Sequence, residues 1–482
     1  MKRILSFSLI LVLLLSFLSG CGGAPAAPET EKASGTAAPE PPFLPEDAYY
    51  DGYTFTVLAA GAAPRGDFNS ERMETPLLRE AVYRRDREAQ DALGITLRTK
   101  EAFGYLSAAS RGEGYRALVL SYGAETCDYD LAAIGAYDAA VLSYCGLLQD
   151  LSALSFPDLS RPWWDQSVEK DLSFSGRLFL AAGDLLPANA GAVGCVLAQE
   201  ALLGAEGARS LRSLVLEGRF TWEELGRAAS ALPASPDGET PASVIVSGGT
   251  VLSALEAAGC RLARTDADGR LTLTLGEPAV KTALAAYAAL AFDPARSYSP
   301  QREGEAVGRW DALRDNAFAS GDGIFCFTSL SAVPALRERG ASFSVLPYPK
   351  VDPAAEYQSP LDLFGTDLLC LPFYQQDRER TGIVTEELAF LSRELVRPAL
   401  ADRYLPEAGA RDGQETELFD LLLLRRAYDP GALYGLGDYP LTLPAADSPA
   451  EFEAAAEAGR SLAADQIGKI NEKLAELYLG VR

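Results

Sequence analysis

The sequence predicts an α/β protein with two lobes, each built on a mostly parallel sheet flanked by helices. Strand-like apolar runs alternate with helix-like ones from residue 53 onward, and such alternation builds parallel sheets covered by helices. Without its N-terminal leader and tether the chain keeps more than 400 of its 482 residues, which exceeds the size at which one hydrophobic core stops growing. A long extended path over residues 176–198 is of the kind that crosses between lobes.

The first half of the chain shows the alternation clearly. A strand at 53–60 precedes a helix at 77–93, in which Leu78, Val82 and Leu93 lie near one face. The strands expected next are 95–100, 130–135, 176–184 and 192–198, and the helices are 115–122 and 137–146.

The second half continues the pattern with clear start signals. Thr221 and Glu224 have the spacing of a capping box, which satisfies free N–H groups at a helix start. An Asp268-Gly269 turn opens a strand at 271–275. The other strands expected are 243–246, 323–328, 343–346 and 366–371, and the other helices are 277–290, 306–319 and 331–339. From about residue 385 onward only helices are evident.

The N-terminus has the three parts of an export signal. Lys2 and Arg3 precede an apolar stretch at 4–17, and the small-residue segment Leu-Ser-Gly-Cys follows at 18–21. The apolar stretch is shorter than the roughly 20 residues that a membrane-spanning helix requires. We therefore predict a signal peptide over residues 1–20 that is cleaved just before Cys21.

Residues 21–48 are predicted to be a tether, because Ala, Pro, Glu, Thr, Gly and Ser dominate them and offer little to bury. The segment Leu-Ser-Gly-Cys resembles the lipobox of bacterial lipoproteins, and this resemblance implies a diacylglyceryl thioether on Cys21. The chain would then be held in the lipid bilayer through Cys21, on the extracellular face of the cell membrane. The alternative is an ordinary cleaved signal with an incidental cysteine.

Composition excludes several kinds of function. The net charge of -24 argues against nucleic acid as a partner, because phosphate binding depends on clustered Lys and Arg. The one basic cluster, residues 79–87, is interleaved with acidic residues and is expected to be a solvated helix face. The chain has no histidine, which excludes Ser-His-Asp and Cys-His catalysis and His-ligated zinc. An enzyme that uses only carboxylates, such as a glycosidase, is compatible with this criterion.

Six cysteines accompany Cys21, and an even number could form disulfides in an exported protein. Three of them, Cys195, Cys326 and Cys370, lie inside apolar strand-like runs, where cysteine behaves as a small buried hydrophobe. We expect buried free thiols there. No pair has the C-x-x-C spacing of a metal or redox site, so we predict neither a metal nor a cofactor.

Several segments, in this order, resemble the extracellular solute-binding proteins of bacterial ABC importers, in particular the carbohydrate-binding branch, family 1. The likeness spans nearly the whole chain and is carried by residues 51–58, 81–86, 129–131, 159–166, 176–184 and 346–350. It implies a two-lobed periplasmic-binding-protein-like fold of type II, with a ligand cleft between the lobes. It also implies an ABC permease in the membrane as the partner.

By this resemblance the chain crosses between lobes near residues 182–187, 360–366 and 397–404. Residues 49–183 would form the first part of lobe 1, and residues 184–360 the first part of lobe 2. Residues 361–398 would return to lobe 1, and residues 399–482 would be C-terminal helices, mainly of lobe 2.

Residues at the crossings are the expected ligand residues. Sugar recognition needs an aromatic plane against the apolar face of the ring and polar groups for the hydroxyls. Open α/β sheets also bind ligands beyond the carboxyl ends of their strands. The candidates are Trp163, Trp164, Asp165, Asp184, Thr328, Ser329, Phe364 and Gly365. The alternative for the two tryptophans is a place in the core, and for Asp184 a role in capping the hinge. Trp222 and Trp310 lie on expected helices, where packing is the favoured interpretation.

The sequence thus predicts a lipoprotein, not an enzyme, that captures a small solute for an ABC importer, with a carbohydrate as the favoured class of ligand. Two alternatives stay open. One is an exported glycoside hydrolase that uses two carboxylates. The other is a sensor lipoprotein of the same fold that presents its ligand to a membrane receptor.

Overall fold

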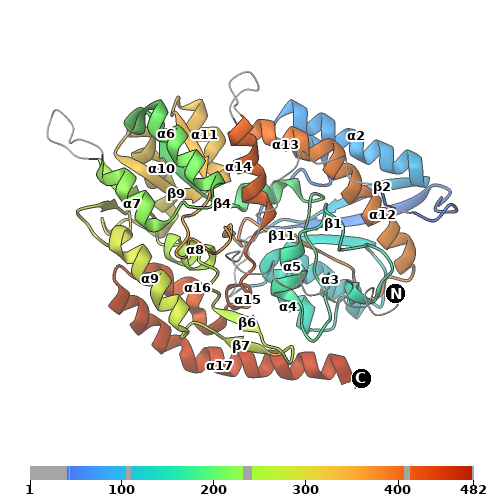
Figure 1. Cartoon of the computed structure of the whole chain (residues 1–482). Coiled ribbons are helices and arrows are strands. Elements are labelled where there is room, and N and C mark those ends of the chain that lie inside the picture. The colour runs from blue at the N-terminus through green and yellow to red at the C-terminus, as the bar shows by residue number, and fades with distance from the viewer. Residues whose placement is uncertain (1–40, 43, 105–109, 232–240, 406–412, 480–482) are drawn as a thin grey trace, which may run out of the picture. The chain divides into compact units, whose positions relative to one another are not determined.

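The computed structural model describes residues 41–42, 44–104, 110–231, 241–405 and 413–479. The predicted signal peptide, Cys21 and most of the tether lie outside these residues, so their predictions stand untested. Residues 42–482 form one unit, in which the strands make two large sheets and one small hairpin. Lobe 1 and lobe 2 below mean the four-stranded and the five-stranded sheet, each with its helices (Figure 1).

Lobe 1 contains a sheet with the strand order β11-β3-β1-β2. Strand β1 pairs in parallel with both β2 and β3, and β11 is antiparallel to β3. Its strands are β1 (Tyr53–Ala60), β2 (Ile95–Glu101), β3 (Leu131–Gly135) and β11 (Asp367–Cys370). Its helices are α2 (Pro76–Leu93), α3 (Glu113–Gly123), α4 (Ala136–Tyr144), α5 (Gln166–Leu172) and α12 (Arg378–Leu391). The sheet is mostly parallel, as predicted.

Lobe 2 contains a mixed sheet with the strand order β10-β4-β9-β5-β8. Its strands are β4 (Gly194–Gln199), β5 (Ala242–Ile245), β8 (Ser297–Tyr298), β9 (Gly323–Ser329) and β10 (Phe343–Leu346). Strand β5 is parallel to β8 and β9, but β4 is antiparallel to both of its neighbours. The parallel arrangement predicted for this lobe therefore holds only on one side, because β4 enters directly from a crossing and not from a helix.

Helices and one small hairpin complete lobe 2 and the C-terminal part. The lobe 2 helices are α6 (Glu200–Leu216), α7 (Trp222–Ser230), α8 (Thr250–Ala257), α9 (Pro278–Ala291), α10 (Trp310–Ser320) and α11 (Val333–Glu338), and the hairpin pairs β6 (Ala263–Thr265) with β7 (Leu271–Leu273). The C-terminal helices are α13 (Arg397–Tyr404), α14 (Gly413–Leu424), α15 (Pro430–Leu433), α16 (Tyr439–Thr442) and α17 (Pro449–Leu479).

Short helical turns connect these elements. The 3-10 turns are Ser70–Arg72, Leu151–Ala153, Pro187–Ala192, Val307–Arg309, Leu330–Ala332, Leu436–Asp438 and Leu443–Ala445, and a π-helical turn at Ser392–Val396 joins α12 to α13. Figure 1 shows α17 running past β7 toward α4, so the last helix extends from lobe 2 to lobe 1.

Local signals explain where several helices start and stop. The Thr75 hydroxyl accepts a hydrogen bond from the backbone N–H of Leu78 at the start of α2, and Gly94 ends this helix with φ at 62°. At the predicted capping box, the Thr221 hydroxyl accepts from the N–H of Glu224 and α7 begins at the next residue. The capping prediction is confirmed.

Three expectations differ from the structure. Residues 176–184 form no regular strand: within this run only single-residue bridges occur, such as Ala181 with Leu369. Helix α6 was not anticipated, and Gly204 within it is non-helical, with φ at 71°. Arg85, inside the basic cluster expected to be solvated, is fully buried and donates to the backbone oxygen of Asp67.

The cysteine prediction can be checked over the described residues. Cys195, Cys326 and Cys370 are buried free thiols, as expected, and no disulfide forms among the described cysteines. None of the described helices is both long and apolar enough to cross a bilayer. The described residues also contain no cluster of Cys, Asp and Glu suited to a metal ion.

Candidate functional site

Two neighbouring chain segments link the lobes. One leads from Gly183 into β4, and the other leads from Ser359 into β11. They run antiparallel, because the N–H of Gly194 donates to the oxygen of Pro360 at 2.8 Å and the N–H of Asp362 donates to the oxygen of Ala192 at 2.9 Å. The carboxyl end of β9 joins them, since the N–H of Leu330 donates to the oxygen of Val193.

Arg65 fastens lobe 1 to both segments. It follows β1, and its guanidinium donates to the Asn189 amide oxygen at 2.8 Å and to the backbone oxygen of Gly365. It also forms an ion pair with Asp367 at 3.4 Å. The Asn189 side chain in turn bonds the backbone of Asp367 through both its oxygen and its nitrogen. Side chains on the two segments are thus held in fixed positions relative to lobe 1.

A tight turn on the second segment presents an aromatic ring. The Asp362 carboxylate accepts from the N–H of Phe364 at 3.1 Å, and the Asp362 backbone oxygen accepts from the N–H of Gly365 at 3.0 Å. This Asx turn explains why the side chain of Phe364 is 41% exposed although the residues on either side of the turn are buried. A large exposed ring beside a charged group suits a sugar face.

Lobe 2 contributes a second aromatic and acidic pair at the start of α10. Trp310 packs against Gly248, where an added Cβ would lie 2.4 Å from the ring, and its indole N–H donates to the oxygen of Glu305 at 2.8 Å. The next side chain, Asp311, is 80% exposed and pairs with the buried Arg314 at 2.7 Å. The ring and the carboxylate are therefore both fixed in place.

Electrostatics connects these two acidic groups. The surrounding protein desolvates Asp362 and raises its pKa, and the negative charge of Asp311 raises it further. The side chain of Asp362 is nevertheless accessible to solvent. Asp311 is exposed as well. We call the group of Arg65, Asp362, Phe364, Trp310 and Asp311 the crossing site.

Of the residues expected from the sequence, Phe364 and Gly365 lie at the crossing site and Ser329 lies beside it. Ser329 ends β9 opposite Gly194, and its hydroxyl lies 2.8 Å from that of the exposed Ser331. Thr328 is buried, and its hydroxyl finds no hydrogen-bond partner among the described residues. For all four of these predicted residues, contact with a ligand remains a prediction.

The two adjacent tryptophans lie in the core of lobe 1. Trp163 is 1% exposed and meets the ring of Phe390 edge-on, with 5.4 Å between ring centres. Trp164 is 4% exposed, and its indole N–H donates to the Glu386 carboxyl group at 3.0 Å. Neither indole offers an open face to a ligand in this structure, so their role in binding remains a prediction that a variant must test.

The two predicted aspartates are held in ion pairs away from the crossing site. Asp165 caps α5 through the N–H of Ser167, pairs with Arg426 at 2.7 Å and accepts from the Tyr428 hydroxyl at 2.8 Å. Asp184 pairs with Arg393 and Arg397. These contacts stabilise the structure around the first link between the lobes, and a ligand role for either residue stays a prediction.

The sequence did not single out Arg65, Asp362 and Asp311. One signal was available: Asp-Leu-Phe-Gly at 362–365 is an Asx-turn pattern, which directs the side chain of the third residue outward. Arg65 and Asp311 join the site only through the fold, since they lie on different lobes.

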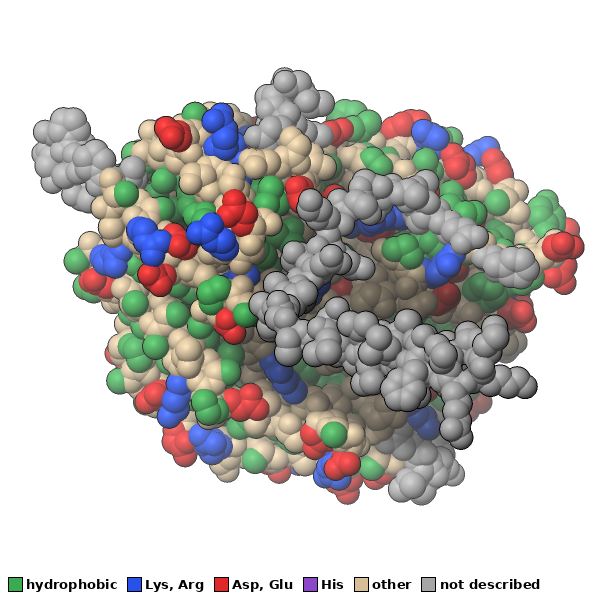
Figure 2. Space-filling model, in the orientation of Figure 1, with side chains coloured by type: hydrophobic (Ala, Val, Ile, Leu, Met, Phe, Trp, Pro, Cys, Tyr) green, Lys and Arg blue, Asp and Glu red, His purple; other side chains and the backbone are tan. Residues whose placement is uncertain are grey.

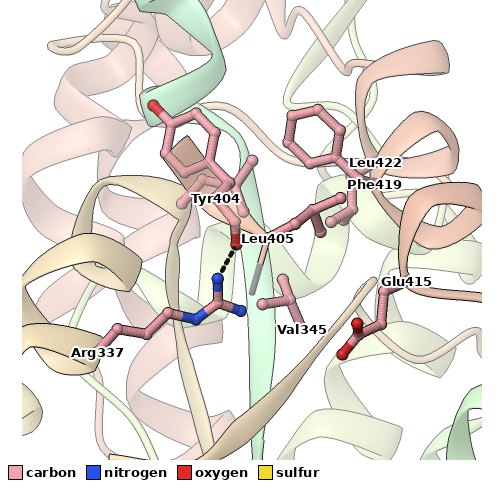
Figure 3. Close-up of a pocket in the computed structure, with 8 residues that line it drawn as sticks. Arg337, Val345, Tyr404, Leu405, Glu415, Phe419 and Leu422 are labelled. Carbon is pink, nitrogen blue, oxygen red and sulfur yellow. Dashed lines mark hydrogen bonds between the residues drawn. The ribbon is translucent and has the colours of Figure 1, made fainter. Parts of the chain in front are cut away.

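A separate small pocket lies between β10 and the helices α13 and α14 (Figure 3). Its walls are mainly apolar, and the Arg337 guanidinium beside it donates to the backbone oxygen of Tyr404 at 2.7 Å. A polyhydroxylated ligand needs several convergent polar groups, so the crossing site suits one better than this pocket does. Figure 2 shows basic and acidic side chains interspersed over the lobe 2 side of the drawn face.

The buried Glu386 beneath Trp164 gives stability a dependence on pH. Burial raises its pKa from 4.5 to about 7. The folded chain holds this proton more tightly than the unfolded chain. The stabilisation that protonated Glu386 gives is therefore fully present below about pH 4.5 and is lost as pH rises through 7. The Glu386→Gln variant lacks this titrating group. The free energy of unfolding of the variant, relative to that of the wild type, should therefore rise by roughly 2–3 kcal/mol as the pH increases from about 5 to 8.

Urea unfolding at several pH values measures this difference. Glu379→Gln is the matched control, because Glu379 is an exposed glutamate on the same helix and should show no such trend. A constant difference between Glu386→Gln and the wild type across the range would contradict the assignment.

No protein-family model matches the chain, and no curated protein sequence does. Solved structures do match. The maltose-binding protein MalE from Listeria monocytogenes, in complex with maltose, is 12% identical, with a TM-score of 0.53 over 87% of this chain and 99% of that one. A family 1 extracellular solute-binding protein from Alicyclobacillus acidocaldarius is 13% identical, with a TM-score of 0.52 over 88% and 99%.

A cyclo/maltodextrin-binding protein in complex with maltotetraose is 15% identical, with a TM-score of 0.51 over 89% of this chain and 99% of that one. Each match spans both lobes. At sequence identities this low, the matches are evidence for the fold alone. The chain has the two-lobed α/β fold of the extracellular solute-binding proteins.

Proposed function

We propose that this chain captures a small carbohydrate at the crossing site and delivers it to an ABC importer. The observation that carries the proposal is an aromatic residue beside a carboxylate on each of two elements, the second linking segment and α10, with Asp311 acting electrostatically on Asp362. Phe364 and Asp362 come from the second linking segment, and Trp310 and Asp311 from α10. Rings for sugar faces and carboxylates for hydroxyl pairs are what such a ligand requires.

The proposal extends to the setting of the protein. Cys21 would carry the lipid, and the proline-containing tether at 21–48 would keep the folded part beside the membrane, within reach of a permease. Solved relatives of this fold include proteins whose structures contain maltose and maltotetraose, which supports sugars as the first ligands to try. The solved structures of this fold named above are binding proteins, which favours capture over hydrolysis.

A thermal-shift screen tests this function. Purified protein is heated with maltose, maltotetraose, other mono- and oligosaccharides, amino acids and short peptides, because a ligand that binds only the folded state raises the melting temperature. We expect at least one sugar to raise it and the amino acids and peptides to leave it unchanged. A shift with a peptide and with no sugar would show that the ligand class is wrong, and release of chromophore from a chromogenic glycoside would favour a hydrolase.

A further inference from the structure

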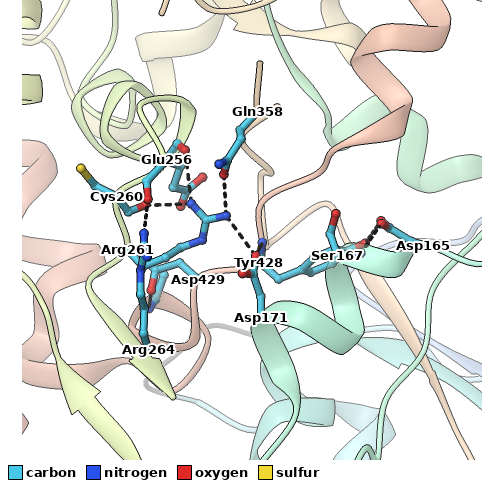
Figure 4. Close-up of polar contacts among 12 residues, drawn as sticks. Asp165, Ser167, Asp171, Glu256, Cys260, Arg261, Arg264, Gln358, Tyr428 and Asp429 are labelled. Atoms are coloured by element: carbon cyan, nitrogen blue, oxygen red, sulfur yellow. Dashed lines mark hydrogen bonds and ion pairs between the residues drawn. The ribbon is translucent and has the colours of Figure 1, made fainter. Parts of the chain in front are cut away.

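Lobe 1 and lobe 2 also touch away from the two linking segments, in the region where α17 passes from β7 to α4. We call this contact the seam: residues 171–175, at the end of α5 in lobe 1, face residues 261–269, which contain β6 and the turn after it in lobe 2. Figure 1 shows β6 and β7 beside α4 and α5, and Figure 4 shows the polar contacts at one end of the seam.

The seam begins with a buried ion pair. Arg261 donates to the Asp171 carboxylate at 3.0 Å, and the two side chains are 4% and 11% exposed. The same guanidinium nitrogen donates to the Gln358 amide oxygen at 2.8 Å, and Asp171 also accepts from the N–H of Tyr428 at 3.0 Å. Four chain segments, one of them leading into the second link between the lobes, therefore meet at this ion pair (Figure 4).

Two further contacts continue the seam at alternate residues. The Thr265 hydroxyl donates to the backbone oxygen of Ser173 at 3.1 Å. The Ser175 hydroxyl donates to the oxygen of Gly269 at 3.3 Å and lies 3.4 Å from that of Asp268. Gly269 is in a left-handed conformation with φ at 73°, and a Cβ on it would lie 2.3 Å from the Ser175 hydroxyl oxygen. The two backbones thus approach as closely as a glycine allows.

Separating the seam would be costly. Parting Arg261 from Asp171 would leave two charges without partners in a buried position, and such a charge is strongly destabilising. Gln358, just before the second linking segment, and Tyr428, before α15, bond the same two charged groups, so these bonds would be strained or broken as well. Relative motion of the lobes is therefore easier by rotation about the seam than by opening across it.

We propose that the seam is a noncovalent connection between the lobes, additional to the chain segments that link them, and that it fixes the axis about which they rotate. The proposal takes from the proposed function only that the lobes move, and it is independent of the ligand. Releasing the seam should let the lobes sample a wider range of separations. A cross-link across the seam should leave the range of lobe separations unchanged, because the seam contacts stay in place as the lobes rotate.

Spin labels on Leu120→Cys in α3 and Val307→Cys before α10 report the separation of the lobes, since these side chains are 73% and 71% exposed. Cys127 and Cys145 are replaced by serine, and electron–electron distance distributions are recorded without ligand. The double variant Asp171→Asn with Arg261→Gln should give a broader distribution than the wild type. Arg264→Gln, an exposed arginine on β6, is the matched control and should not.

A second measurement covers the case in which the double variant does not fold. Ser173→Cys and Thr265→Cys are joined by a short bis-maleimide in the otherwise intact seam, and the distribution should match that of the protein before cross-linking. A narrowed distribution would show that the seam opens, and it would overturn the proposal. An unchanged distribution in the folded double variant would overturn it equally. Neither result depends on sugar binding, so failure of the thermal-shift screen is a separate outcome.

Discussion

Replacing Trp163 with alanine should lower the free energy of unfolding by about 3–5 kcal/mol. The indole is 1% exposed, stacks under the Arg161 guanidinium at 5.0 Å and meets Phe390 edge-on, so its removal leaves a cavity in the core of lobe 1. Affinity for the sugar found in the thermal-shift screen should stay unchanged, because the ring lies away from the crossing site.

Urea unfolding measures the stability, and titration calorimetry well below the melting temperature measures the affinity. Leu120→Ala is the control, because its side chain is 73% exposed and should change stability by less than about 0.5 kcal/mol. If Trp163→Ala instead kept its stability and lost its affinity, the ring would be a ligand residue, as the sequence suggested.

Arg426→Ala should destabilise the fold by a similar amount, about 3–5 kcal/mol. Its guanidinium pairs with Asp165 at 2.7 Å, and the two side chains are 8% and 1% exposed. Removing one partner leaves the Asp165 carboxylate buried with the Tyr428 hydroxyl as its remaining side-chain donor. The loss of stability is large because this carboxylate would stay buried without a counter-charge.

The neighbouring Arg425 provides a matched control for that result. It pairs with Glu356, but the two side chains are 44% and 64% exposed, so Arg425→Ala should cost at most about 1 kcal/mol. Urea unfolding of both variants at one pH decides the matter. Equal losses for Arg425→Ala and Arg426→Ala would show that burial of the Asp165 pair does not set its contribution.

Periodicity and caps predicted most of the fold because these signals are local. The run at 53–60 and the helix after it formed as expected, and the Thr221 capping box placed the start of α7. The run at 176–184 is as apolar as a central strand, yet it pairs at single residues only, because strand formation depends on a partner elsewhere in the chain. Gly204 and Gly207 weaken the helical pattern of α6.

The site was harder to predict, because its members come from distant parts of the chain. Phe364 was predicted because it lies at an expected link between the lobes; its ring is exposed, and its contact with a ligand remains a prediction. Trp163 and Trp164 have the chemistry of ligand residues, but burial is decided by the packing of α12 against them, which the sequence does not display. The charge of Asp311 acts on Asp362 only once the chain has folded, because the two residues lie on distant segments.

The affinity of Phe364→Ala for the sugar with the largest thermal shift tests the crossing site most directly. Tyr83→Ala serves as its control, because that ring is 52% exposed on α2 and takes no part in the crossing site. Calorimetry should show the affinity of the Phe364 variant weakened by about fivefold or more, since a stacked aromatic face contributes about 1 kcal/mol, and that of the Tyr83 variant unchanged. Wild-type affinity in both variants would place the ligand elsewhere and contradict the crossing site.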